Sequence, residues 1–106
     1  MSKKEPKLPG TLKVGGMTFK VEINNDWVSG AEANAVTLLE TLEIKLNDVT
    51  PLIHRQRTFL HEALHAIDSV YCNGATLTEQ QVHAVAQGFL QVLHDNPDFV
   101  NFILAD

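Results

Sequence analysis

The sequence predicts an α+β fold, in which a small, mostly antiparallel sheet of three or four strands packs on two helices. Short segments of alternating apolar and polar residues occupy much of the first half of the chain, as is typical of strands. The second half instead repeats apolar residues at helical spacing. A chain of 106 residues supports one modest core. We therefore expect a single domain over residues 11–106.

The N-terminal part predicts a tail followed by a hairpin. Residues 1–10 are rich in Lys and Pro, so we expect a disordered tail. Residues 11–14 and 17–23 read as strands, and the second alternates strictly. Gly15-Gly16 between them favours a tight turn, because glycine readily adopts positive φ angles. Trp27 follows in a loop, where we expect it to act as a lid on the core.

The middle of the chain is harder to assign. The composition of residues 29–41 fits either a helix or a strand, whereas Leu42–Leu46 alternates and predicts a strand. A turn follows, in which Asp48 or Thr50 could cap the next helix. Pro51 would then occupy the first helical position, where its missing N–H is tolerated.

A second helix is predicted by its capping residues. Thr78 with Gln81 forms a capping box, and Thr76 with Glu79 forms one in the alternative register. Apolar residues at helical spacing indicate that one face of this helix packs on the core: Val82, Val85, Ala86, Phe89, Val92 and Leu93.

A short last helix is predicted from Pro97 onward, with Asn96 as its cap. The run from Phe99 to Leu104 is almost entirely apolar. We expect it to dock on the core, with a dimer contact as the alternative.

Composition excludes several classes of function. The net charge of −5, with Lys and Arg totalling eight, argues against a nucleic-acid binder. The single cysteine, Cys72, excludes an internal disulfide and suits a reducing compartment. No apolar run follows the first residues as in a signal peptide, and none approaches the roughly 20 residues of a membrane helix. We expect a cytoplasmic protein without a membrane partner; the sequence does not indicate its oligomeric state.

The chemistry is concentrated in His61-Glu62-Ala63-Leu64-His65. This H-E-x-x-H motif lies in a predicted helix that ends near Tyr71, where Gly74 favours a left-handed close. Positions four apart differ by about 40° around a helix, so both imidazoles project to one side and can hold one zinc ion. The flanking residues are apolar nearly all round the helix, which predicts burial. Buried imidazoles and carboxylates need partners, and this requirement favours a metal site over solvated surface histidines.

A third zinc ligand must come from elsewhere in the chain, because catalytic zinc typically takes three. Glu79 opens the helix that returns beside His65, and His83 lies one turn further on. Asp68 shares the stripe of the two histidines, but its short side chain would reach the metal with difficulty. Cys72 would make a softer, more structural site. The spacing favours Glu79 and leaves the others open; Asp68 or His83 could instead support an imidazole from outside the ligand set.

The chain resembles the ImmA/IrrE-type zinc peptidases. Three segments carry the resemblance: Glu43–Asn47, Arg55–His65 and Glu79–Ala86. The first two look like the strand and active-site helix of that family, and the third like its following helix. The chain is also similar to small phage and prophage proteins with the same motif, and in size to minimal gluzin peptidases. The resemblance covers roughly residues 12–95, departs from the family pattern at Ala63 and His83, and implies a strand and hairpin over residues 36–41.

This resemblance implies that the chain is a zinc metalloendopeptidase that acts on peptide or protein substrates. His61, His65 and Glu79 would hold Zn²⁺, which lowers the pKa of a bound water. Glu62 would take that water's proton as general base and pass it to the leaving amine.

Two further roles and one alternative follow. Tyr71 or His83 could donate a hydrogen bond to the transition state. We expect the substrate to lie extended along an edge strand formed by Leu42–Leu46. The alternative is a non-catalytic zinc-binding module that acts through a partner protein, because so short a chain has little room for substrate pockets.

Overall fold

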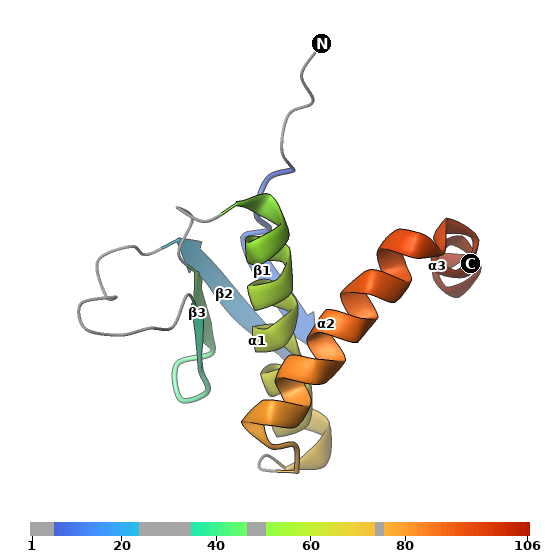
Figure 1. Cartoon of the computed structure of the whole chain (residues 1–106). Helices are drawn as coiled ribbons and strands as arrows, with labels where there is room; N and C mark the ends of the chain where they lie inside the picture. The colour runs from blue at the N-terminus through green and yellow to red at the C-terminus, as the bar shows by residue number, and fades with distance from the viewer. Residues whose placement is uncertain (1–5, 24–34, 47–50, 74–75) are drawn as a thin grey trace.

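Four strands precede three helices along the chain (Figure 1). The structure, a computed structural model, describes residues 6–23, 35–46, 51–73 and 76–106. The elements are β1 (Thr11–Val14), β2 (Met17–Ile23), β3 (Ala35–Leu38), β4 (Glu43–Leu46), α1 (Leu52–Cys72), α2 (Glu79–Asp95) and α3 (Pro97–Leu104). The α+β class is therefore confirmed, and so is the strand and hairpin expected over residues 36–41.

The strands form one mixed sheet in the order β1-β2-β4-β3. The β1–β2 and β4–β3 pairs are antiparallel, and the central β2–β4 pair is parallel. The sheet is thus mostly antiparallel, as predicted. The expectation that Leu42–Leu46 forms an edge strand is wrong, because β4 is paired on both sides and has no free edge for a substrate. The edge strands are β1 and β3.

One helix, α1, covers the sheet and closes the main core. The inward positions of β2 and β4 supply its largest buried side chains, and β1 and α1 complete it: Val14, Phe19, Val21, Ile44, Leu46 and Ala66. The alternation predicted for β2 is confirmed at Phe19 and Val21, whereas Met17 and Ile23 at the strand ends are exposed.

The β1–β2 turn lies against the end of α1, and this contact requires glycine. Gly15 has a φ of 61°, and a Cβ at this position would lie 2.7 Å from Val70 Cγ1. Any larger residue would therefore meet both a strained backbone and a steric clash. Of the two glycines expected to have positive φ, Gly15 does and Gly16 does not.

Contacts with the fold begin before Thr11. Leu8 packs against the core, and the Gly10 carbonyl accepts a hydrogen bond of 2.9 Å from the Val21 N–H. Part of the tail expected over residues 1–10 therefore contacts the sheet. Several expectations lie outside the described residues: disorder of residues 1–5, the lid at Trp27, the caps at Asp48 and Thr50, and the close at Gly74.

The ends of α1 differ in detail from the prediction. Pro51 is the N-cap rather than the first helical residue, and its carbonyl accepts from the N–H groups of His54 and Arg55. At the other end Asn73 is left-handed, with a φ of 60°, and its N–H donates to the Asp68 carbonyl. Asn tolerates this conformation better than most residues, so it can close the helix without glycine.

The second helix packs on α1 rather than on the sheet, which corrects the expectation that both helices cover it. Its predicted capping box is confirmed: the Gln81 N–H donates to Thr78 Oγ1 at 3.0 Å, and the Thr78 N–H donates to Gln81 Oε1 at 2.9 Å. Only Val82 and Ala86 of α2 are buried, because the second half of the helix diverges from α1 (Figure 1).

The expectation that the last helix docks on the core is wrong. No residue of α3 is buried, and α3 packs mainly against α2. The Asn96 side chain donates to the Val92 carbonyl at the end of α2 and does not cap α3. None of the described helices is both long and apolar enough to cross a membrane.

Candidate metal centre

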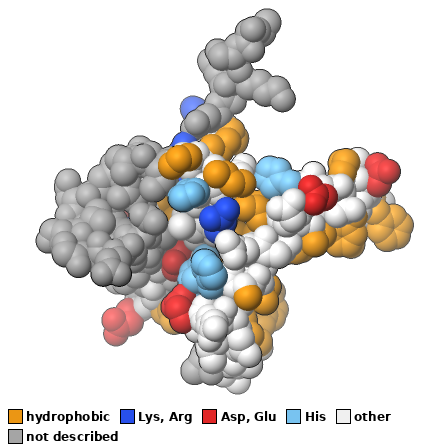
Figure 2. All heavy atoms as spheres, in the orientation of Figure 1, with side chains coloured by type: hydrophobic (Ala, Val, Ile, Leu, Met, Phe, Trp, Pro, Cys, Tyr) orange, Lys and Arg blue, Asp and Glu red, His pale blue; other side chains and the backbone are white. Residues whose placement is uncertain are grey.

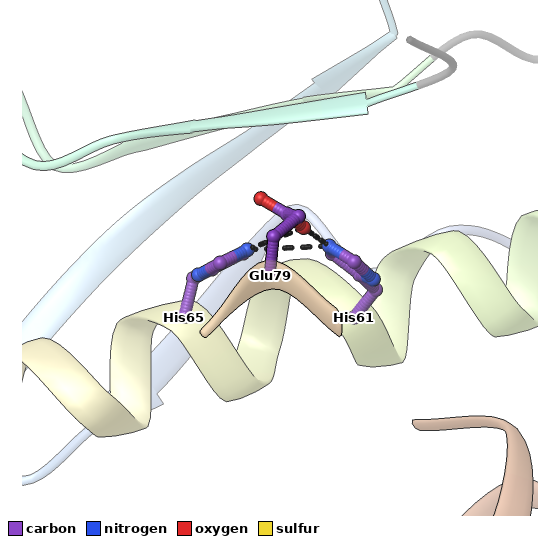
Figure 3. A group of neighbouring side chains, drawn as sticks. All are labelled: His61, His65 and Glu79. Carbon is purple, nitrogen blue, oxygen red and sulfur yellow. Dashed lines mark hydrogen bonds and ion pairs between the residues drawn. The ribbon is translucent and has the colours of Figure 1, made fainter. Parts of the chain in front are cut away.

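Three side chains from two helices converge between α1 and the first turn of α2 (Figure 3). They are His61, His65 and Glu79, whose candidate ligand atoms all lie within 4.8 Å of one another. The two Nε2 atoms are 3.2 Å apart. Glu79 Oε1 lies 3.1 Å from His65 Nε2 and is hydrogen-bonded to His61 Nε2. This group could hold a metal ion.

Local geometry explains why these groups meet. The four-residue spacing puts His61 and His65 one turn apart on the side of α1 that faces α2. The capping box starts α2 at Glu79, so this carboxylate leaves the first turn and reaches back over α1. At this end of α2 the side chain remains 73% exposed, and an ion or substrate can approach it from solvent.

Two of the three spacings within the group fit a tetrahedral ion, whereas Glu79 Oε1 and His61 Nε2 are hydrogen-bonded and lie closer together than two ligands of one ion would. Two nitrogen ligands at zinc–nitrogen distances of about 2.0–2.1 Å should lie about 3.3 Å apart in a tetrahedral site. The Nε2 atoms of His61 and His65 are 3.2 Å apart, and the separation of 3.1 Å between His65 Nε2 and Glu79 Oε1 is similar. Two imidazoles and one carboxylate are also a donor set that zinc uses when one position stays open.

The two neighbouring histidines favour the ionised form of Glu79, which is the form that binds a cation. Hydrogen bonding to His65 lowers the pKa of Glu79 below its usual value; burial opposes this shift, and hydrogen bonding to His61 and the charges of both histidines lower the pKa further. Glu79 is therefore ionised at neutral pH, and an anionic oxygen faces the two imidazoles.

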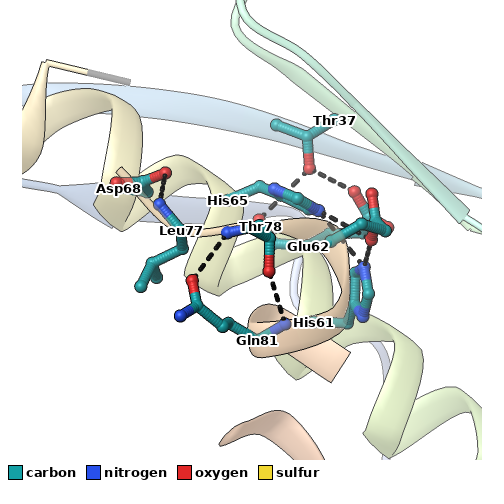
Figure 4. Close-up of polar contacts among 9 residues, drawn as sticks. Thr37, His61, Glu62, His65, Asp68, Leu77, Thr78 and Gln81 are labelled. Carbon is teal, nitrogen blue, oxygen red and sulfur yellow. Dashed lines mark hydrogen bonds and ion pairs between the residues drawn. The ribbon is translucent and has the colours of Figure 1, made fainter. Parts of the chain in front are cut away.

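Glu62 lies beside this group but points to the sheet. Its side chain is buried, and the Thr37 hydroxyl of β3 donates a hydrogen bond of 2.6 Å to Glu62 Oε1 (Figure 4). Burial raises the pKa of Glu62; the Thr37 hydrogen bond and the charges of His61 and His65 oppose the rise. A carboxylate with a raised pKa near a metal site is the kind of group that serves as a general base.

Asp68 does not contact either imidazole in the structure. It is buried on α1, and its Oδ2 accepts a hydrogen bond of 3.1 Å from the Leu77 N–H. Its Oδ1 is buried without a hydrogen-bond partner among the described residues. Because Leu77 lies two residues before Glu79, Asp68 anchors the segment that leads into α2 (Figure 4).

The remaining candidates lie outside the group. The rings of His83 and His61 are 6.2 Å apart, so His83 is a neighbour of the ligand set and not a member of it. Tyr71 is 67% exposed, and its hydroxyl lies near Gly15 at the β1–β2 turn. Cys72 is a free, exposed thiol at the end of α1. The structure thus brings Glu79, but not Asp68, Tyr71 or Cys72, to the two histidines.

Sequence reasoning missed Thr37. Nothing near it in the chain points to Glu62, which is 25 residues away. The strand register shows which way Thr37 faces: Thr37 pairs with Ile44, and Ile44 in turn pairs with Val21. Directly paired residues project to the same face of a sheet, so Thr37 faces α1 together with these two buried side chains.

No protein-family model, curated protein or solved structure matches this chain.

Proposed function

We propose that this chain is a zinc-dependent peptidase. The observation that carries the proposal is the convergence of His61, His65 and Glu79 beside the buried carboxylate of Glu62. Two imidazoles and a carboxylate on two helices, with a non-ligand carboxylate next to them, are the parts that zinc-assisted hydrolysis requires. The motif and its flanks also resemble the ImmA/IrrE-type peptidases, although no family model matches the chain.

Each residue has a distinct role in this proposal. His61, His65 and Glu79 would hold a zinc ion, which would supply Lewis acidity for the activation of water and the polarisation of a scissile carbonyl. Glu62 accepts the proton of the attacking water and later delivers it to the leaving amine. Thr37 holds one oxygen of that carboxylate, and this contact orients the other oxygen and limits its rotation.

The surroundings offer two places for a substrate. The outer edge of β3 has no partner among the described strands, so an extended peptide could add to it next to Thr37. An open pocket of about 550 Å³ also lies between α1 and α2, with Arg57 and Ile53 on one wall and Leu90 and His94 on the other. Arg57 is one helical turn before His61, but no residue of the metal group lines this pocket, and its α2 wall begins at Gln87, about two turns after Glu79.

Metal content and one matched variant test the proposal. Protein purified without a His-tag or added metal should contain about one zinc per chain and should cleave members of a broad peptide library. Glu62→Gln should keep the zinc and the fold but reduce kcat/KM by about 10²- to 10⁴-fold, the usual contribution of a general base. The absence of stoichiometric zinc in well-folded protein would refute the proposal.

One observation favours a second candidate function, a non-catalytic zinc-binding module that acts through a partner protein. Thr37 already engages Glu62 Oε1, and this hydrogen bond competes with the carboxylate's use as a base. In such a module Glu62 would serve only to join β3 to α1. A zinc-loaded wild-type protein that cleaves no peptide in the library would support this second function over the first.

A further inference from the structure

The second half of α2 and all of α3 form an arm that projects from the body of the protein (Figure 1). Large apolar side chains of this arm, together with Val85 just before it on α2, are exposed to solvent: Val85, Phe89, Val92, Phe99, Phe102, Ile103 and Leu104. We call these seven residues the apolar face. Hydrophobic side chains run along the arm to its tip (Figure 2).

The spacing of these residues is typical of helix faces that pack against other parts of a protein. Val85, Phe89 and Val92 recur at intervals of four and three, so they form one stripe on α2. On α3, Phe102 and Ile103 lie three and four residues after Phe99, so these three residues also share one side of their helix. Such stripes normally face a core or another helix, yet Phe102 is 81% exposed here.

The last helix, α3, also requires a packing partner to be stable. It has 8 residues, none of them buried. Isolated helices shorter than roughly 12–15 residues are marginal in water, and most helical stability comes from packing an apolar side. Contact with α2 alone leaves Phe102, Ile103 and Leu104 mostly exposed.

We infer that this face is a homodimer interface, in which the arms of two copies of the chain pack against each other. The seven side chains expose on the order of 700 Å² per copy, close to the roughly 800 Å² that each partner buries in a standard-sized interface. This area also exceeds the largest apolar patch of a typical monomer, which is about 300–600 Å². A two-fold pairing of the same face with itself is the commonest arrangement of soluble oligomers.

Charge argues against an anionic membrane surface or a nucleic acid as the occupant of the apolar face. The face itself contains no charged residue, so its pairing with a second copy is opposed by the flanking carboxylates and not by the face. The chain has no Lys or Arg after Arg57, and the arm carries Asp95, Asp98 and Asp106. An anionic membrane surface or a nucleic acid would therefore be repelled by the same arm.

Sedimentation equilibrium of the full chain tests the inference. Across a roughly 100-fold range of concentration, the mass should approach twice the 11.7 kDa of one chain. Phe102→Asp should weaken dimerisation by about 30-fold or more, as expected for an aromatic anchor at an interface. Because Phe102 is 81% exposed within the chain, this variant should retain the circular dichroism of wild type.

Leu39→Asp provides the matched control. Leu39 is 46% exposed in the β3–β4 turn, away from the arm, so an equal change in charge there should leave the dimer intact. A chain that stays monomeric at every concentration overturns the inference. So does a dimer that tolerates both Phe102→Asp and Val92→Asp, or a monomer that binds neutral phosphatidylcholine vesicles through this face.

Discussion

Thr37 and Glu62 join the sheet to the motif helix through a side-chain hydrogen bond. The Thr37 hydroxyl lies 2.6 Å from Glu62 Oε1 and 3.1 Å from the carbonyl oxygen of the same residue. This contact places the edge strand β3 next to the carboxylate that we assign as general base. It also makes the pKa of that carboxylate depend on a residue of another element.

Replacing Thr37 with Val should raise the pKa of Glu62 further in the metal-free protein. The hydrogen bond from Thr37 stabilises the ionised carboxylate, so its loss leaves the burial effect less opposed. The pKa can be followed by NMR titration of the Glu62 side-chain carboxyl. In the active enzyme, the acidic limb of the pH–kcat/KM profile should move to higher pH.

The same shift predicts how stability responds to pH. Folding raises the pKa of Glu62. The contribution of Glu62 to the free energy of unfolding is therefore fully present below the pKa of the unfolded state, and it is lost as pH rises through the pKa of the folded state. Thr37→Val should move this loss to higher pH in urea unfolding of the metal-free protein. Thr41→Val is the control, since Thr41 donates to the carboxylate of Glu43 at an exposed site. Equal pH responses of the two variants would contradict the assigned role of Thr37.

Zinc should stabilise the fold by mass action. A ligand present at about 100 times its Kd adds about 2.7 kcal/mol to the free energy of unfolding, if it binds only the folded state. For a domain of this size that corresponds to roughly 10 °C or more in Tm. We therefore expect Tm to fall by about this amount when a chelator strips the metal, and to recover when zinc is added. A Tm that is unchanged by a chelator shown to remove the metal would contradict the prediction.

Local rules predicted the elements whose signals lie within a few residues. Gly15 at a positive φ and the alternation of Met17–Ile23 identified the first hairpin, and Thr78 with Gln81 identified the start of α2. The convergence of His61 and His65 follows from helical spacing alone. These features depend on local backbone geometry, so tertiary context does not alter them.

Features set by contacts between distant segments were predicted less well. The composition of residues 29–41 fitted either a helix or a strand and gave no direction for Thr37, which faces α1 because it pairs with Ile44. The interior position of β4 depends on its parallel pairing with β2, which no local pattern indicates. The apolar run Phe99–Leu104 suggested docking on the core, yet α2 carries it away from the body.

Glu79 and His83, two of the four residues considered as the third ligand, should respond differently to substitution. Glu79 Oε1 contacts both Nε2 atoms, whereas the ring of His83 lies 6.2 Å from that of His61. Glu79→Ala should therefore weaken zinc binding by more than about 100-fold, while His83→Ala should weaken it by roughly 10- to 100-fold at most. Competition with a chromophoric chelator measures both. If His83→Ala strips the metal and Glu79→Ala retains it, the site is a three-histidine centre.

Asp68 should affect zinc binding through the backbone rather than through the ligands. Its Oδ2 accepts from the Leu77 N–H, two residues before Glu79, and the Asn73 N–H donates to its carbonyl oxygen. Asp68→Ala leaves the Leu77 N–H without its acceptor, which costs about 1–3 kcal/mol of unfolding free energy. Because the segment that delivers Glu79 is then less restrained, zinc affinity should fall by roughly 10-fold.

Asp68→Asn separates this tethering role from a role of the charge. The amide keeps a carbonyl oxygen for the Leu77 N–H, and it places no charge at the position where Oδ1 is buried without a partner. This variant should therefore bind zinc with near wild-type affinity, whereas Asp68→Ala should not. Chelator competition and thermal unfolding of the metal-free forms measure affinity and stability separately. If Asp68→Asn and Asp68→Ala weaken zinc binding equally, the charge of the Asp68 carboxylate matters more for zinc affinity than its hydrogen bond to the Leu77 N–H. That result would contradict the tethering role.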